Sequence, residues 1–182
     1  MNAAQELVLE HAVIMKIVVA LKAQGAALSS GQAVPAAQLS ETLSLLVDFA
    51  DKCHHAKEER VLFPELAGLP EHAPAVSAFL GEHERSRGNV GAMKAALPKI
   101  ESDPASRKNF ADNANAYVAI LLPHIQKENA LFARCGEIFS PAENARMAGE
   151  FERIELEEVG EGKHDEYRER AEKLSLGVKR VP

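Results

Sequence analysis

The feature that most constrains this chain is a histidine followed four residues later by a glutamate, which occurs twice. The two copies read CHHAKEERVLFP from residue 53 and PHIQKENALF from residue 123. On a helix, residues four apart lie on one face with β-carbons about 5–6 Å apart, so the imidazole and the carboxylate point at the same place. One such pair is ordinary in a helix, whereas two copies indicate a site that holds a metal ion.

Two further histidines, His11 and His83, lie in two other segments with helical apolar periodicity. A lone histidine on an apolar stripe is more often a hydrogen-bonded core residue than a ligand. Four segments that each place an imidazole on the inner face, two of them with a carboxylate, favour the metal interpretation. Burying that many polar groups without a metal or a complete hydrogen-bond network would cost free energy.

Periodicity and loop signals predict an all-α fold: an up-down four-helix bundle over residues 1–138 and a charged helical tail over residues 139–182. The bundle helices are expected at about residues 4–24, 35–64, from 74, and 104–135, with Gly25 ending the first. The tail is expected to pack on the bundle or to serve association. Its acidic run at 150–158 and His164 are expected on the solvated surface.

His54 and His55 are adjacent, and periodicity favours His54 as the inward residue. Helical steps back from His54 meet apolar residues at 50, 47 and 43, whereas steps back from His55 meet polar residues at 51, 48 and 44. The inward pair is then His54 with Glu58, and His55 and Glu59 are candidates for an outer layer that orients the ligands. Aligning the two copies by their Leu-Phe pairs instead matches His55 and Glu59 to the second copy's pair, and that alternative stays open.

Composition describes a single domain of 182 residues with 46% hydrophobic content and a net charge of -6. An acidic chain gives no support for nucleic-acid binding. No run of apolar residues is expected to span a bilayer. The N-terminal residues lack a secretory signal pattern, so a cytoplasmic location is expected. Cys53 and Cys135 follow no zinc or disulfide spacing and are interpreted as packed thiols.

The ordered set of histidines and glutamates resembles the hemerythrin-like (HHE cation-binding) proteins over about residues 4 to 135. That family implies an up-down four-helix bundle around a non-haem di-iron centre. In it, the two glutamates bridge the metals and the four histidines are terminal ligands. The metal ligands implied here are His11, His54, Glu58, His83, His124 and Glu128. Imidazoles and carboxylates also suit zinc or manganese as substitutes.

Arg87 marks a departure from the oxygen-carrying members, which have a fifth histidine at this position. The departure disfavours simple oxygen carriage and favours chemistry with, or sensing of, peroxide or nitric oxide. Pro123, which breaks a helix rule directly before His124, also indicates a functional site. Tyr117 is either a hydrogen-bond donor to the same site or a plain core residue.

Two functions therefore remain in view. The first is a di-iron protein that binds or reacts with oxygen, peroxide or nitric oxide, with no nucleic-acid or membrane partner. If it is an enzyme, it is a di-iron oxidoreductase directed at peroxide or nitric oxide. The second is a metal- or redox-responsive regulatory or structural bundle that acts through a protein partner. The sequence does not choose between enzyme, sensor and store, and it does not give the oligomeric state.

Overall fold

A computed structural model describes residues 2–178, and within this range the chain is helical with short loops and no strand. Elements η1 and η2 are π-helical and η3 is a 3-10 turn. In chain order the elements are α1 (Ala3–Ser29), α2 (Ala36–Leu45), η1 (Leu46–His55), η2 (Glu58–Leu62), α3 (Phe63–Ala67), α4 (Ala73–Ala96), η3 (Leu97–Lys99), α5 (Pro104–Phe132), α6 (Cys135–Ile138), α7 (Pro141–Glu158) and α8 (Lys163–Val178).

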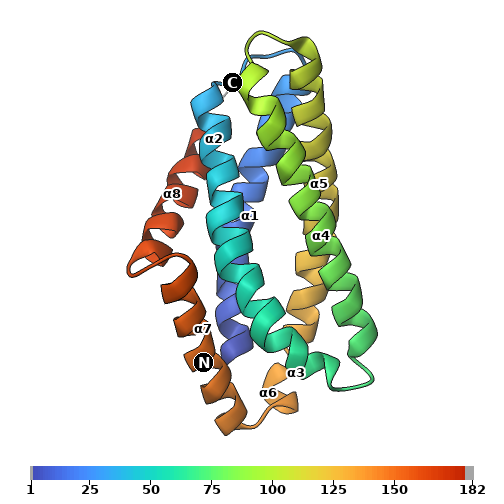
Figure 1. The fold of residues 1–182 in the computed structure, drawn as a ribbon, viewed down its shortest axis with the longest axis vertical. Coiled ribbons are helices and arrows are strands. Elements are labelled where there is room, and N and C mark those ends of the chain that lie inside the picture. Colours follow the sequence, from blue (N-terminus) through green and yellow to red (C-terminus); the bar gives the residue numbers. More distant parts are fainter. Residues whose placement is uncertain (1, 179–182) are drawn as a thin grey trace.

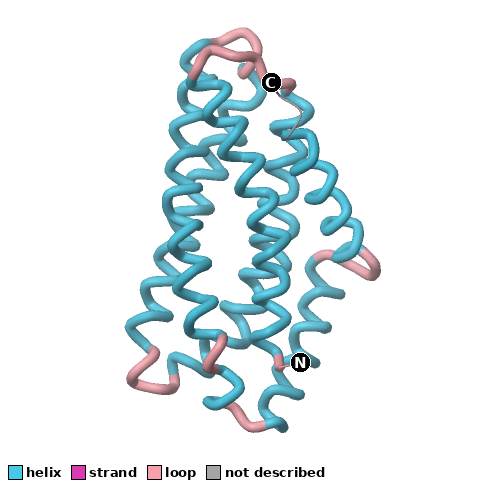
Figure 2. The backbone as a smooth tube through the Cα atoms, turned by 180° about the vertical axis from the view of Figure 1, so that it is seen from behind, coloured by secondary structure: helices cyan, strands magenta, loops and turns pink. Residues whose placement is uncertain are grey.

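Four long rods run up and down beside one another: α1, the continuous stretch from α2 to α3, α4 and α5 (Figures 1 and 2). The predicted all-α, up-down four-helix bundle is confirmed. Helices α7 and α8 lie along its outside and pack on α1, with α8 also packing on α2 (Figure 1). The domain boundary after residue 138 stays a prediction, and residues 1 and 179–182 of the two predicted domains lie outside the described range.

Helix α1 is longer than predicted, because it continues through Gly25 to Ser29. A β-carbon at Gly25 would lie 3.2 Å from the β-carbon of Ala114 on α5, tighter than an ordinary contact. The glycine is therefore used for close packing of two helices rather than as a stop signal. The start of α1 is fixed by Asn2, whose side chain accepts from the backbone N–H of Gln5 while the Gln5 side chain accepts from that of Asn2.

The second rod changes its hydrogen-bond pattern where the first His-x-x-x-Glu copy lies. Residues 46–55 and 58–62 are π-helical, so each turn holds more residues than an α-helical turn. Consecutive side chains are then separated by a smaller angle around the axis. Two neighbours such as His54 and His55 can therefore both face the interior, and they are 1% and 3% exposed.

The apolar core is divided into two clusters, and every rod carries its candidate ligands between them. One cluster includes Ile14, Phe49 and Met93, and the other includes Leu7 and Phe79. On α1, for example, His11 follows Leu7 by one turn and precedes Ile14 by about one turn. A layer of polar side chains therefore crosses the middle of an apolar bundle.

Helix α1 corrects the expectation that no segment is apolar enough to span a membrane. By length and composition alone, α1 is long and apolar enough to cross a membrane, with a mean hydropathy of 1.5 over its most apolar window. The expectation considered only uninterrupted apolar runs, whereas a spanning window tolerates an occasional charge. In the fold half of this window is buried, and α1 packs against α5 and α8.

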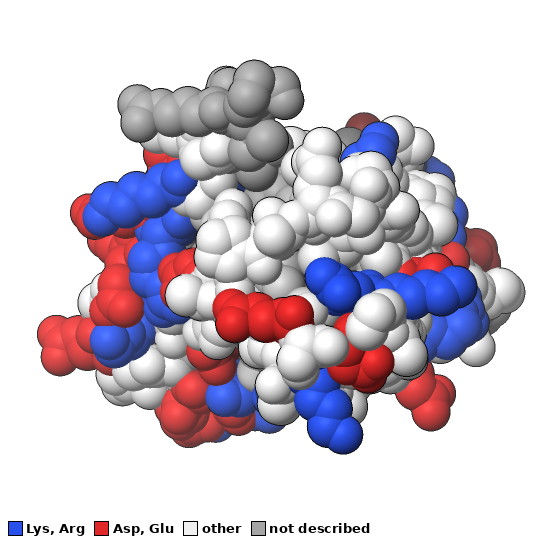
Figure 3. All heavy atoms as spheres, turned by 90° about the horizontal axis from the view of Figure 1, so that it is seen from above, with Lys and Arg blue, Asp and Glu red and all other residues white. Residues whose placement is uncertain are grey.

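Figure 3 shows the end of the bundle with Lys/Arg and Asp/Glu intermingled around its rim.

Candidate metal centre

The structure brings the six predicted ligands together in the polar layer of the bundle. Each rod contributes at least one of them, and none is more than 2% exposed. The side chains are His11 from α1, His54 from η1, Glu58 from η2, His83 from α4, and His124 and Glu128 from α5. These are the residues whose spacing placed them on inner helix faces.

The Glu58 carboxylate faces both ends of this layer. Its Oε1 lies 3.2 Å from His54 Nε2 and 3.9 Å from His11 Nε2, while its Oε2 lies 3.5 Å from His83 Nε2. One oxygen therefore serves one pair of histidines and the other oxygen faces the second pair. The Glu58 carboxylate therefore lies between the histidines of the two sides.

Glu128 does the same from the opposite rod. Its Oε2 lies 3.2 Å from His11 Nε2, and its Oε1 lies 3.0 Å from His124 Nε2 and 3.8 Å from His83 Nε2. Burial raises the pKa of Glu128, but His11 and His124 lower it more, so the pKa lies below its usual range and the carboxyl group is charged. The two glutamates thus divide the layer into a His11/His54 side and a His83/His124 side.

The orientation of the four imidazoles is set by a closed ring of contacts around the bundle. In each case the Nδ1 atom faces an oxygen on the preceding rod, and that acceptor stands next to a predicted ligand in the sequence. The pairs are His54 with Glu10 at 2.9 Å, His83 with Glu59 at 2.7 Å, His124 with Glu82 at 2.8 Å and His11 with Asn129 at 2.8 Å. A neutral imidazole that donates from Nδ1 presents the lone pair of Nε2 to the centre.

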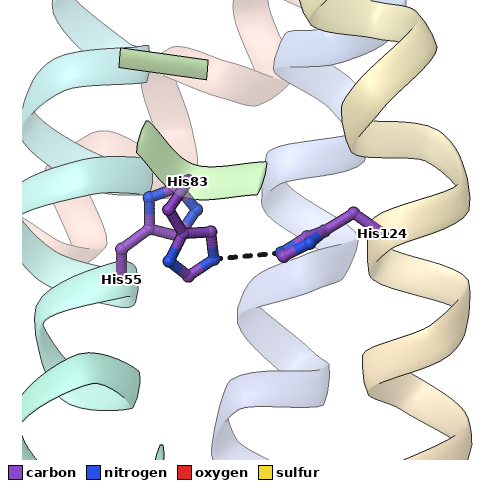
Figure 4. A group of neighbouring side chains, drawn as sticks. All are labelled: His55, His83 and His124. Carbon is purple, nitrogen blue, oxygen red and sulfur yellow. Dashed lines mark hydrogen bonds between the residues drawn. The ribbon is translucent and has the colours of Figure 1, made fainter. Parts of the chain in front are cut away.

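The atoms that face the centre are those a metal needs. Both oxygens of Glu58, both oxygens of Glu128 and Nε2 of His11 are buried without a hydrogen-bond partner among the described residues. Nε2 of His83 and Nε2 of His124 lie 3.0 Å apart (Figure 4). With metal–nitrogen bonds of about 2.0–2.1 Å, two nitrogens at right angles on one ion are about 3 Å apart. The donor set therefore fits a metal site.

Behind the His11/His54 side lies a buried network of charges centred on Lys57. Its ammonium donates to Glu10 at 2.6 Å, Glu6 at 2.9 Å and Glu155 at 3.0 Å, and its side chain has no exposed area. Burial lowers the pKa of Lys57, but the carboxylates, Glu10 first, raise it more, so Lys57 stays charged. Glu155 belongs to α7, so the network ties the C-terminal helices to the histidine that Glu10 holds.

His164 of α8 joins the same network, which corrects the expectation that it is a surface residue. Its Nε2 lies 3.1 Å from Glu10 Oε1, and its side chain is 22% exposed. Burial raises the pKa of Glu10, but the hydrogen bonds from His164 and His54 lower it by more. The pKa therefore lies below its usual range, and Glu10 remains a carboxylate. No local sequence pattern indicates this contact, because the two residues are far apart in the chain.

Residues 2–135 match the family model of the hemerythrin HHE cation-binding domain. The chain is a member of this family. The matched range holds all six predicted ligands and their four acceptors, and their clusters of histidine and glutamate fit a metal site. No solved structure is a significant match to the chain.

Relatives of this HHE domain include an uncharacterized protein of Mycobacterium bovis and two uncharacterized proteins of Mycobacterium tuberculosis. Each is 26% identical over 162 residues, which is 88% of this chain and 64% of the relative. The chain thus spans slightly less than two thirds of the length of these curated relatives.

Sequence reasoning missed the burial of His55 in this HHE domain. An ideal helix places it on the flank, whereas the π-helical turn turns it inward beside His83. The signal available was the alternative alignment of the two copies, which matched His55 and Glu59 to the second pair. Glu59 is in fact the acceptor for His83, so both alignments of the repeat describe residues of the site.

Proposed function

We propose that the chain is a non-haem di-iron protein that binds or reacts with a small oxidant or diatomic molecule: oxygen, peroxide or nitric oxide. The observation that carries the proposal is the division of each carboxylate between the two histidine pairs. A single tetrahedral ion needs four ligands, whereas here six converge and both acids reach both pairs.

The donor types are compatible with iron. Imidazole and carboxylate suit iron, zinc and manganese, and the groups of donor atoms found in this layer among the described residues include no cysteine sulfur. When bound, a pair of irons supplies reversible electron transfer and a coordination position for a diatomic or peroxide. The protein supplies the rest: Glu10, Glu59, Glu82 and Asn129 fix the ring tautomers, and the two apolar clusters exclude bulk water from the layer.

The test is Mössbauer spectroscopy of the iron-loaded protein exposed in turn to oxygen, peroxide and nitric oxide. We expect a change of iron oxidation state or ligation with at least one of the three, within minutes. The matched control is Glu58→Ala with Glu128→Ala, which removes the bridging groups and is expected to lose the paired-iron signal. An iron-loaded wild-type protein inert to all three reagents would contradict the proposed reactivity.

A second candidate function is favoured by the contacts of Glu10. This carboxylate receives hydrogen bonds from His54 of the metal centre and His164 of α8, and Lys57 links it to α7. A change at the metal is thereby connected to the C-terminal helices, as a regulatory bundle acting through a protein partner requires. Hydrogen exchange of residues 141–178 in iron-loaded and chelator-treated protein tests it; identical protection in both would dismiss this function.

A further inference from the structure

A cavity of about 230 Å³ opens at the surface beside the metal centre, between η1, α4 and α5. One of its lining residues is His55, which is 3% exposed and whose ring stacks on that of His83 with centroids 3.8 Å apart (Figure 4). The described residues that line the cavity include none of the six predicted ligands. The cavity is therefore a separate space that adjoins the metal centre.

Much of the cavity lining is apolar. Leu46 and Val47 line it from η1, and Val90 and Gly91 line it from α4. An apolar cavity of about 150 Å³ holds a molecule the size of benzene, whereas pockets for drug-sized ligands start at about 300 Å³. The cavity therefore suits a small organic molecule with one ring or a short chain.

Two hydroxyl groups lie among these apolar side chains. Ser86 is 2% exposed, and its Oγ is buried without a hydrogen-bond partner among the described residues. Burying a hydroxyl without a partner costs free energy, so a ligand that accepts a hydrogen bond from Ser86 gains affinity. Tyr117 is also 2% exposed and lines the cavity. Burial raises the pKa of its phenol, so the hydroxyl is neutral and can donate.

The charged residues that line the cavity leave one positive charge unpaired. Arg87 Nε lies 2.7 Å from Asp51 Oδ1, so the Asp51 carboxylate is neutralised. Lys94 lines the same cavity, is exposed, and forms no ion pair within the described part of the chain. In a chain with a net charge of -6, this local positive charge favours an anionic ligand.

We propose that this cavity is a binding site for a small organic monocarboxylate. The apolar body of the ligand packs against Leu46 and Val90, while its carboxylate accepts hydrogen bonds from the Ser86 and Tyr117 hydroxyls and faces the Lys94 ammonium. Hydrogen bonds to a charged acceptor are about twice as strong as those to a neutral one. The inference goes beyond the proposed function and does not depend on the metals, because no predicted metal ligand takes part.

The first test is calorimetric titration of the iron-loaded full chain with benzoate, and with benzamide as the matched neutral ligand. We expect benzoate to bind with a dissociation constant at or below about 1 mM, as a well-packed ligand of this size does. Benzamide is expected to bind at least about fivefold more weakly, because it lacks the charge. Chelator-treated protein should bind benzoate as tightly as iron-loaded protein. Crystals soaked in a brominated benzoate should show an anomalous bromine peak between η1 and α4.

Variants of α4 test the position of the ligand. Ser86→Ala is expected to weaken benzoate binding at least about fivefold without lowering the free energy of unfolding, because the hydroxyl has no partner to lose. Gly91→Leu is expected to weaken binding at least about tenfold, since a side chain at this lining position takes up part of the cavity. A β-carbon added at Gly91 or at Gly88 meets no neighbouring group within 4 Å. Gly88→Leu, outside the cavity lining, is therefore the matched control with unchanged binding.

Any of four results would overturn the assignment. They are no heat of binding at millimolar benzoate, equal affinity for benzoate and benzamide, and wild-type benzoate affinity in both Ser86→Ala and Gly91→Leu. The fourth is a bromine peak between Glu58 and Glu128 together with loss of binding on chelation, which would place the carboxylate on the metals. Iron-loaded protein that is inert to oxygen, peroxide and nitric oxide would instead contradict the proposed function, so the two failures are distinguishable.

Discussion

The two sides of the polar layer are built from the same kinds of ligand but are supported differently. Behind His54, the acceptor Glu10 is 2% exposed and is neutralised by the fully buried Lys57, under the cover of α7 and α8. Behind His83 and His124, the acceptors are 26% and 16% exposed and pair with Arg87 and Lys127 at the surface. A cavity also opens on this second side.

One side of the polar layer is therefore anchored, and the other is accessible. Buried charges are stable only where each one is paired with an opposite charge and fully hydrogen-bonded. The Lys57 network therefore leaves the His54 side chain little conformational freedom. Ion pairs whose side chains are partly exposed are screened by water and contribute little to stability. We therefore expect substitutions on the Lys57 side to affect folding and those on the Arg87 side to affect mainly ligation.

The largest expected effect is that of Lys57→Met. Removing the ammonium leaves Glu10 buried without its cation, and breaking a buried ion pair costs about 3–5 kcal/mol. Lys127→Met, the matched change on the accessible side, removes a side chain that is 47% exposed and should cost less than about 1 kcal/mol. Denaturant unfolding of the two variants measures both values, and equal losses of stability would show that the two sides are supported equally.

A second pair of variants separates folding from metal binding. Glu10→Gln and Glu82→Gln each remove the charge that orients one ligand histidine, and loss of such an acceptor weakens metal affinity about 10–100-fold. Glu10→Gln should also destabilise the fold, because Lys57 loses its nearest carboxylate. Competition with a chelator gives the affinity, and thermal unfolding gives the stability. If Glu82→Gln destabilised the fold as much, the accessible side would not be independent of folding.

His164→Ala is expected to have a moderate effect. It removes the hydrogen bond from α8 to Glu10, which is worth about 1.5–3 kcal/mol for a charged acceptor and less for a group that is 22% exposed. We expect a loss near 1 kcal/mol and faster hydrogen exchange in α8. His164→Gln, which keeps a donor, should recover most of the loss; failure to recover would indicate that the ring is needed for packing.

The smallest expected effect on stability is that of Arg87→Ala, below about 1 kcal/mol, since the guanidinium is 41% exposed. Its effect should appear instead in ligation, because Asp51 and Glu59 lose their common partner. We expect altered Mössbauer parameters for one iron and unchanged parameters for the other. A change at both irons, or a stability loss above about 2 kcal/mol, would show that Arg87 belongs to the structural core.

The bundle and the six converging side chains could be anticipated because they depend on helical spacing alone. His54 and Glu58 lie four residues apart, and so do His124 and Glu128, and this relation survives the change from α- to π-helical turns near them. The family resemblance gave the same six residues. What spacing could not give is the phase of His55, because a π-helical turn is a change in backbone hydrogen bonding that leaves no mark on the apolar pattern.

The supporting contacts could not be predicted because they connect different rods. Glu10 and Glu82 stand next to predicted ligands in the sequence, yet each holds a histidine from the following rod. Lys57, in the middle of the first motif, would be placed on a solvated flank by its charge. Only the positions of Glu6, Glu10 and Glu155 around it explain its burial.

Whether two ions lie between Glu58 and Glu128 can be decided by anomalous scattering at the iron edge from crystals of the iron-loaded protein. We expect two peaks, one beside His11 and His54 and one beside His83 and His124, each next to both carboxylates. One peak alone, or peaks elsewhere than between these two acids, would contradict this expectation.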